Sequence, residues 1–250
     1  MIAVYWLEQT EADVPLLNDW LGRGEVLRLN SMRFNKRRRE WRLGRWTAKN
    51  AVASYLRLPY EMCSLAEIQI VSVSSGAPEV CFAKSPAEIT ISLSHREGMA
   101  ACAVAGCKMA LGCDLETIEP RGDAFLSDYF TLEEQRLVVI DRAGRDLLLN
   151  LLWSAKESAL KALCTGLRAD TCCVAVCPSV PPFEVGTWHR LQVRHLSGRV
   201  FDGWWKQSGG LVRTVVADCA FAPPVPLRTS GRIERIHATV QEESTNFSLT

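Results

Sequence analysis

The sequence predicts an α+β fold in which antiparallel strands and amphipathic helices form one or two lobes. Residues 33–58 and 146–164 have apolar side chains at helical spacing, which predicts two long helices. Residues 89–93 and 99–105 are short apolar runs on either side of a turn, which is typical of a hairpin. With 250 residues, 48% of them hydrophobic, the chain is long enough to bury a sizeable core.

The first half of the chain predicts a strand, a helix and a further strand, in that order. Residues 1–7 are mostly apolar and are followed at once by acidic residues, so we read them as a first strand rather than as a secretion signal. The helix of 33–58 comes next. Residues 67–73 predict another strand, and the glycine and proline of 74–78 predict a turn after it. In the hairpin that follows, we expect Ser94 and His95 to lie at the tip.

The strand around Asp114 carries two acidic side chains. Asp114 and Glu116 are two residues apart in an alternating pattern, so both leave the strand from one face. Because their carboxylates lie close together, one cation can reach both. In the helix of 146–164, Glu157 and Lys161 are one turn apart, on a different face from the apolar row.

The second half predicts helices over 128–142 and 146–164, separated at Ala143-Gly144. Strands are expected at 174–176, 188–196, 201–207 and 211–221. This half repeats the broad plan of the first, but the sequence shows no obvious residue-level repeat. We expect residues 222–250, which are proline-rich and then polar, to form a mobile tail.

Composition excludes several classes of protein. The net charge of +1 gives no overall field that would favour nucleic acid or an anionic membrane. The ten cysteines lie mostly in apolar runs and lack zinc spacing, so we interpret them as small buried residues of a cytoplasmic protein. The apolar stretch 98–113 is too short to span a membrane and contains Lys108.

A basic stripe runs along the helix of 33–58. Arg38, Arg42, Arg45 and Lys49 recur at helical spacing. Such a stripe is usually a solvated face, but it can also hold an anion.

Three short blocks supply the chemistry of the sequence, and they occur in order. They are Ile91 to Gly98, Leu111 to Glu116 and Trp153 to Lys161. Together they offer a serine and a histidine that can hold phosphate, carboxylates that can hold a hard divalent cation, and lysines that can neutralise negative charge. Each block by itself is more often structural: an isolated Glu157–Lys161 pair would be a weak surface ion pair. Their joint occurrence favours Mg²⁺-assisted attack on a phosphate.

These blocks resemble the motifs of the 4′-phosphopantetheinyl transferases, and specifically of the long, single-chain, surfactin-synthetase-activating type. The matching residues are Ser94-His95, Gly112 to Glu116, Phe130 to Glu134, Trp153 to Lys161, Gly44-Arg45 and Gly76-Ala77-Pro78. The resemblance covers roughly residues 1 to 220. The sequence departs from the family's usual Gly-Lys-Pro at Ala77, so a charged contact from that position is missing.

The resemblance implies a 4′-phosphopantetheinyl transferase fold, with two similar α/β lobes related by a pseudo-twofold axis. It implies an N-terminal lobe at 1–106 that contacts the coenzyme A nucleotide and a C-terminal lobe at 107–221 with the metal and catalytic residues. The join is expected near Gly106 to Lys108. Because both lobes belong to one chain, a monomer is expected.

The resemblance also implies an activity: transfer of the 4′-phosphopantetheine group of coenzyme A to a serine of an apo acyl or peptidyl carrier protein, with release of 3′,5′-ADP. Asp114, Glu116 and Glu157 are expected to hold Mg²⁺. Glu157 is expected to be the general base, directly or through a water molecule on the metal, with Glu134 as the alternative. Lys161 is expected to neutralise or protonate the leaving group.

The coenzyme A site implied by the resemblance is built from both lobes. Arg45 is expected to contact the 3′-phosphate, and the backbone of the 76–78 turn the adenine end. The remaining expected cofactor-binding residues are Ser92, Ser94, His95 and Lys161.

Several alternatives stay open from the sequence. A Mg²⁺-dependent phosphohydrolase would use the same metal with water as acceptor, and a non-catalytic coenzyme A-binding module would keep the fold. A nucleic-acid-binding protein is disfavoured by the near-neutral charge. The carrier partner and its pathway are not defined by the sequence.

Overall fold

The computed structural model describes the chain except residues 1, 84, 107–108, 142, 180–183 and 230–250. Its α-helices are α1 (Arg23–Ser31), α2 (Asn35–Leu56), α3 (Met62–Glu67), α4 (Asp123–Tyr129), α5 (Leu132–Ile140) and α6 (Arg145–Ala162). Its strands are β1 (Val4–Thr10), β2 (Ile68–Ser72), β3 (Pro78–Phe82), β4 (Ser85–Pro86), β5 (Thr90–Arg96), β6 (Met99–Ala105), β7 (Leu111–Thr117), β8 (Val174–Pro178), β9 (His189–His195), β10 (Val200–Ser208), β11 (Leu211–Ala217) and β12 (Val225–Pro226). The 3₁₀ helices are η1 (Glu11–Asp13), η2 (Gly166–Arg168) and η3 (Thr171–Cys173). The predicted α+β class is confirmed.

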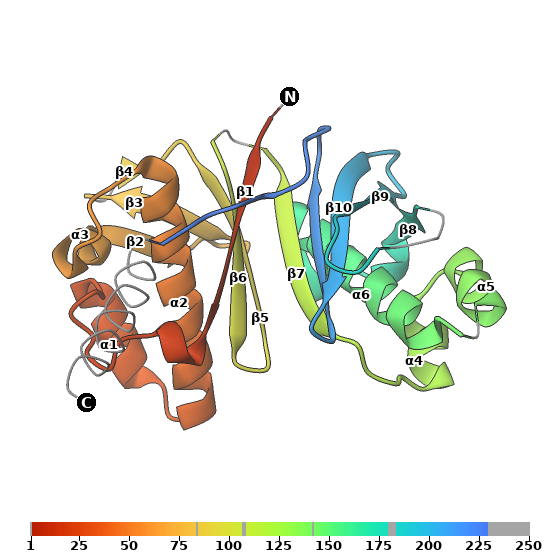
Figure 1. Ribbon diagram of the computed structural model, residues 1–250, viewed down its shortest axis with the longest axis horizontal. Helices are drawn as coiled ribbons and strands as arrows, with labels where there is room; N and C mark the ends of the chain where they lie inside the picture. Colours follow the sequence, from red (N-terminus) through yellow and green to blue (C-terminus); the bar gives the residue numbers. More distant parts are fainter. Residues whose placement is uncertain (1, 84, 107–108, 142, 180–183, 230–250) are drawn as a thin grey trace, which may run out of the picture.

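The first half of the chain is built on the sheet β12-β1-β6-β5, against which the long helix α2 packs (Figure 1). A small sheet, β2-β3-β4, lies beside it. The core between α2 and these strands includes Trp20, Trp46, Val52 and Ile68, all buried. Burial of such large apolar side chains supplies most of the driving force for this half.

The second half is built on the sheet β7-β11-β10-β9-β8, which α6 covers. Its core contains Phe130, Leu152, Phe201 and Trp205. Trp204 and Trp205 of β10 are both buried.

The two sheets meet where β5 and β6 lie beside β7, at the centre of the molecule (Figure 1). A third apolar cluster joins them, with Trp6 and Ala103 from the first half and Cys113 and Val215 from the second. The ion pair between Arg213 of β11 and Glu8 of β1 also crosses between the halves. The expected join at Gly106 to Lys108 falls largely outside the described residues.

Similar segments recur at a fixed spacing in the two halves of the chain. β1 pairs with β6, and β7 with β11, through antiparallel ladders of seven residue pairs each. The same 107 residues separate Val4 from Leu111 at the start of β1 and β7. They also separate Trp46-Thr47-Ala48-Lys49 in α2 from Trp153-Ser154-Ala155-Lys156 in α6. A single repeated tetrapeptide is too short to detect until the strand registers align it.

The two repeated lysines have the same structural environment. Lys49 is fully buried, forms an ion pair with Glu25, and donates to the carbonyls of Trp20 and Leu65. Lys156 is fully buried, forms an ion pair with Glu134 at 2.8 Å, and donates to the carbonyls of Thr171 and Val174. Each lysine therefore anchors its long helix to the chain segment that surrounds it. Lys49, expected on a solvated or anion-binding basic stripe, is instead structural.

Most predicted elements are confirmed with small shifts of their ends: the helix of 33–58 is α2 and that of 146–164 is α6. The segment 128–142 is shorter than expected, because Phe130 breaks it into the end of α4 and the separate helix α5. Helices α1 and α3 were not predicted. Both are short, and their apolar faces are defined mainly by what they pack against.

The C-terminal prediction is wrong for residues 222–229. Val225–Pro226 pairs in parallel with β1, and the amide of Leu227 donates to the carbonyl of Trp6. Residues 230–250 of the expected tail lie outside the described part.

Cys81, Cys102 and Cys113 are free thiols and are buried as expected, whereas the other described cysteines are at least partly exposed. None of the helices in the described ranges is long and apolar enough to cross a membrane.

Replacing Glu134 with glutamine should leave the Lys156 ammonium buried without its counter-charge. We expect the free energy of unfolding to fall by about 3–5 kcal/mol, measured by urea denaturation. Glu40→Gln is the control, because its pair with Lys36 is solvent-exposed at 3.9 Å and should contribute within about 0.5 kcal/mol. A loss below about 1 kcal/mol for Glu134→Gln would contradict the anchoring role.

Candidate active site

Strand β7 lies at the edge of its sheet, and two serines of β5 satisfy its outward-facing amides. The Ser92 hydroxyl accepts a hydrogen bond from the Cys113 amide at 2.9 Å, and the Ser94 hydroxyl accepts one from the Leu115 amide at 3.2 Å. Both serines are buried. Ser92 and Ser94 were expected to bind coenzyme A, but their hydroxyls instead join the two sheets. Ser94 lies within β5 rather than at the hairpin tip.

Asp114 of β7 is the most buried carboxylate of the predicted metal set, with 2% of its surface exposed. Its Oδ1 accepts hydrogen bonds from the Ser94 hydroxyl at 2.8 Å and from the Lys161 ammonium at 2.7 Å. Its Oδ2 is buried and has no hydrogen-bond partner. A buried carboxylate oxygen without a donor is costly, so this atom is an open position for a cation.

Lys161 reaches Asp114 because α6 packs very closely on β7. A Cβ at Gly112 would lie 1.7 Å from the carbonyl oxygen of Ser158, so only glycine permits this approach. The Lys161 ammonium also donates to the Cys113 carbonyl at 3.0 Å. Burial is the largest single effect and lowers its pKa, but the charges of Asp114, Cys113 and Glu157 and the hydrogen bond to Asp114 together raise the pKa above the usual lysine value. Lys161 therefore stays charged, which favours its predicted role in neutralising charge over the alternative of donating a proton.

Glu157 lies one turn before Lys161, with its Oε2 at 3.9 Å from the ammonium. Burial, followed by the nearby charge of Asp114, raises the pKa of Glu157 to about 7. A carboxylate with this pKa can accept a proton near neutral pH, which is the property required of the predicted general base.

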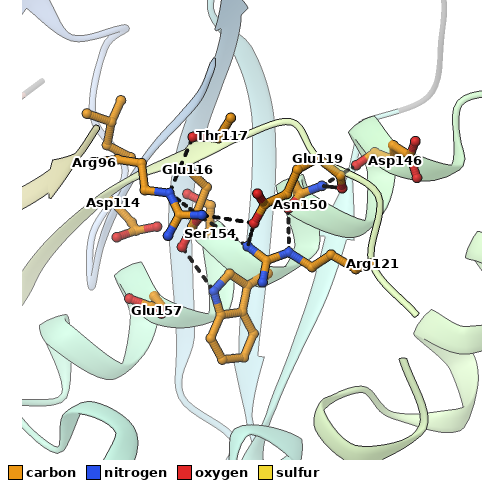
Figure 2. A network of polar contacts seen from close by, with 12 residues as sticks. Arg96, Asp114, Glu116, Thr117, Glu119, Arg121, Asp146, Asn150, Ser154 and Glu157 are labelled. Atoms are coloured by element: carbon orange, nitrogen blue, oxygen red, sulfur yellow. Dashed lines mark hydrogen bonds and ion pairs between the residues drawn. The ribbon is translucent and has the colours of Figure 1, made fainter. Parts of the chain in front are cut away.

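Glu116 is held by three side chains. The Trp153 indole donates to its Oε1 at 3.2 Å, while Arg121 and Arg96 approach its Oε2 at 3.2 and 3.6 Å. Figure 2 shows the two arginines converging on Glu116 and Glu119 from opposite sides, with Asp114 and Glu157 nearby. Burial and the charge of Asp114 raise the pKa of Glu116.

The three carboxylates suit a hard divalent cation such as Mg²⁺. They offer only oxygen ligands, the charge of Asp114 raises the pKa of both Glu116 and Glu157, and Asp114 contributes an oxygen with no other partner. Among the described residues, however, no group of three or more such side chains is already arranged to enclose a metal ion. Lys161, Arg96 and Arg121 neutralise these carboxylates instead.

Glu134, the alternative general base, does not belong to this site. It is 1% exposed, and its Oε2 accepts hydrogen bonds from the Thr131 amide and hydroxyl while pairing with Lys156. Its Oε1 accepts from the Val176 amide at 2.9 Å. Both oxygens of Glu134 are therefore engaged in the interior, which favours a structural role for this side chain.

Arg45 lines a cavity of about 510 Å³ between α1, α2 and β2, together with Arg28, Arg37 and Trp41. Its guanidinium stacks over the Trp41 ring at 5.1 Å and lies 3.8 Å from Glu25. Burial lowers its pKa, and its Nε has no hydrogen-bond partner. The cavity is therefore suited to an anionic group.

The turn 76–78 offers fewer free amides than expected. The Gly76 amide donates to the Val73 carbonyl at 2.8 Å, and the Ala77 amide to the Ser75 hydroxyl at 3.3 Å. Pro78 has no amide hydrogen and already belongs to β3. The amide contacts that the resemblance implies are thus taken within the turn. Arg168 donates to the Ser75 carbonyl and so links this turn to the end of α6.

His95 is exposed on β5. Because side chains alternate along a strand, it leaves β5 on the face opposite to Ser94 and Arg96. The structure does not gather it with Asp114 and Glu116.

Sequence reasoning missed Arg96, Arg121, Asn150 and Arg168. Arg96 directly follows His95, and Arg121 follows the acidic strand after Pro120. A basic residue beside each motif was the available signal, but exposed arginines are common and gave no reason to single these out.

The raised pKa of Glu157 predicts how the stability of the metal-free protein depends on pH. The folded protein holds this proton up to about pH 7, whereas an unfolded carboxyl releases it near 4.5. The contribution of Glu157 to stability should therefore fall as the pH rises between these two values. The melting temperatures of the parent protein and of Glu157→Gln, compared across this range, should diverge in favour of the variant. A constant difference between them would contradict the raised pKa.

Among the described residues, which include Cys172, Cys173 and Cys177, no group of three or more histidine, cysteine or acidic side chains is arranged to hold a metal ion.

Comparison with known proteins relates the segment that contains this site to one protein family. Residues 110–207 match the model of the 4′-phosphopantetheinyl transferase superfamily, and this segment contains Asp114, Glu116, Glu157 and Lys161. A search of curated proteins found no match. Members of the superfamily act on carrier proteins with coenzyme A and typically use a divalent metal. The match to this superfamily model covers residues 110–207, and it supports a transferase of phosphopantetheine.

Proposed function

We propose that the protein transfers the 4′-phosphopantetheine group of coenzyme A to a serine of an apo acyl or peptidyl carrier protein. The reaction requires Mg²⁺ and releases 3′,5′-ADP. The observation that carries the proposal is the gathering of Asp114, Glu116, Glu157 and Lys161 where α6 packs on β7, within the segment that matches the superfamily.

The chain further belongs, in this proposal, to the long, surfactin-synthetase-activating type, with two lobes related by a pseudo-twofold axis and a monomeric active form. The spacing of 107 residues, the equal strand ladders and the paired environments of Lys49 and Lys156 support the internal repeat. The free thiols of the described cysteines support a cytoplasmic protein.

The repeat also explains why one acidic site is expected rather than two. At the same spacing of 107 residues, Asp114 corresponds to Leu7, Glu116 to Gln9, and Glu157 to Asn50. The first half therefore has uncharged side chains at all three positions. Only the second half can attract a divalent cation in this way.

Asp114, Glu116 and Glu157 would hold Mg²⁺, with Asp114 Oδ2 as a ready ligand. The bound ion would neutralise and polarise the pyrophosphate of coenzyme A.

Glu157 accepts the proton of the carrier serine as the serine oxygen forms its bond to phosphorus. The bond between this phosphorus and the oxygen of 3′,5′-ADP breaks, and the charged Lys161 neutralises the negative charge that develops there. Glu157 then releases its proton to solvent. In the metal-free protein the pKa of Glu157 is about 7, so this carboxylate has an affinity for a proton near neutral pH that suits a general base.

The coenzyme A nucleotide would be bound by the first half. Arg45 and the basic cavity around it are suited to the 3′-phosphate, and His95 remains available to a phosphate because it is exposed. The turn 76–78 would pack against the adenine end of coenzyme A. It would not donate hydrogen bonds from the Gly76 and Ala77 amides, because both already donate within the turn.

Intact-mass analysis of an apo carrier protein tests the proposal. With this protein, coenzyme A and Mg²⁺, the carrier should gain one phosphopantetheine group, and excess chelator should prevent the gain. Consumption of coenzyme A without a heavier carrier would instead indicate hydrolysis. Binding of coenzyme A with no reaction would indicate a binding module.

Asp114→Asn and Lys161→Met should each slow transfer by about 10² to 10³, because each removes a preorganised charge from the site. The initial rate of carrier modification measures the effect, and melting curves verify that the variants are folded. Glu67→Gln changes an exposed carboxylate at the end of α3 and should leave the rate unchanged. A near-normal rate for either site variant would remove that residue from the mechanism.

A further inference from the structure

Two arginines share two carboxylates beside the candidate active site. Arg96 lies 2.9 Å from Glu119 and 3.6 Å from Glu116, and Arg121 lies 3.2 Å from each. The two positive charges balance the two negative charges (Figure 2). In this state Glu116, an expected metal ligand, already has its counter-charge.

Arg121 is fixed in place by several contacts. Its Nε donates to the Oδ1 of the buried Asn150 at 2.7 Å, and its guanidinium stacks over the Phe125 ring at 4.6 Å. Its backbone carbonyl accepts from Arg145 at 2.8 Å. The side chain is only 17% exposed, so Arg121 is a rigid support for Glu116.

Arg96 is held much less firmly. It is the last residue of β5, its side chain is 33% exposed, and its Nε is 3.3 Å from the Thr117 hydroxyl. Its distance to Glu116 is longer than that of a hydrogen bond. Among the described residues, Glu119 forms the one short ion pair with Arg96, and that carboxylate is 40% exposed. Arg96 can therefore leave Glu116 at little cost, whereas Arg121 cannot.

A divalent cation and Arg96 compete for Glu116. Both need the same oxygen lone pairs, which agrees with the lack of a preformed metal cluster among the described residues. A cation held next to Arg96, Arg121 and Lys161 would also leave the site with excess positive charge. A pyrophosphate that enters with the cation restores the balance, and a guanidinium is well suited to bind it.

We propose that Arg96 is a phosphate-binding residue that exchanges Glu116 for the pyrophosphate of coenzyme A when metal and coenzyme A enter together. Arg121 stays on Glu116 as a positioning residue. This inference rests on the proposed function and extends it to the order of binding: metal and coenzyme A each strengthen the binding of the other. Linkage requires the two enhancements to be equal.

Binding measurements on the metal-free full-length protein test this coupling without relying on turnover. Mn²⁺ serves as the metal probe, titrated by electron paramagnetic resonance with and without coenzyme A, and coenzyme A is titrated by calorimetry with and without Mn²⁺. In the parent protein, each ligand should tighten the binding of the other by about tenfold, the effect of one charged hydrogen bond.

Arg96→Gln should have opposite effects on the two ligands. Mn²⁺ alone should bind more tightly than to the parent protein, because the competing guanidinium is gone. Coenzyme A should bind about tenfold more weakly in the presence of Mn²⁺, and the coupling should shrink accordingly. Arg96→Lys keeps the charge and should restore part of the coenzyme A affinity, and it serves as the second test if Arg96→Gln does not fold.

Arg199→Gln is the matched control. Arg199 is a half-exposed arginine that pairs with Asp218 at 3.7 Å, and its removal should change neither titration.

Unchanged Mn²⁺ and coenzyme A binding in folded Arg96→Gln would overturn the inference while leaving the proposed function intact. Weaker Mn²⁺ binding in Arg96→Gln would also overturn it, because Arg96 would then support the metal site rather than compete for it. If the parent protein binds neither ligand and does not modify a carrier, the proposed function itself fails.

Discussion

The carboxylate of Asp114 is the contact on which the arrangement of the site depends. One of its oxygens receives the Ser94 hydroxyl from β5 and the Lys161 ammonium from α6, so three elements from both halves of the chain meet at a single atom. The Ser92 and Ser94 hydroxyls at the same time satisfy the free amides of β7. The edge of this sheet, which would otherwise present unpaired backbone amides, thus forms one wall of the site.

Two buried ion pairs give the helices around this contact their rigidity. Lys49 with Glu25, and Lys156 with Glu134, fix α2 and α6 to the loops and short helices beside them. Because the carbonyls and amides around each pair are also hydrogen-bonded, the charges are compensated despite their burial. The side chains that carry the proposed chemistry, Glu157 and Lys161, therefore extend from a firmly held helix.

Three carboxylates lie close together in the site, and in the metal-free protein neighbouring basic side chains neutralise their charge. The charge of Asp114 raises the cost of ionising Glu116 and Glu157, and Lys161, Arg96 and Arg121 offset that cost. A site with this balance of charge should bind a cation more tightly when an anion binds with it. This property suits a reaction between a divalent metal and a pyrophosphate, and the different mobility of the two arginines decides which of them can respond.

The sequence by itself determined the elements with strong periodicity, namely α2, α6, β7 and the two hairpins, because their apolar patterns are local. It also determined which carboxylates and which lysine are close, since Asp114 with Glu116 and Glu157 with Lys161 are neighbours on one strand and one helix. Only the tertiary structure decided which polar side chains face the site. Ser92, Ser94 and Glu134 match functional motifs, yet Ser92 and Ser94 bond to residues of β7 that lie 20 or more positions away, and Glu134 bonds the Val176 amide 42 positions away and pairs with Lys156. Arg96 and Arg121 could not be assigned to the site from the sequence either, because the packing of distant strands and helices brings them beside Glu116.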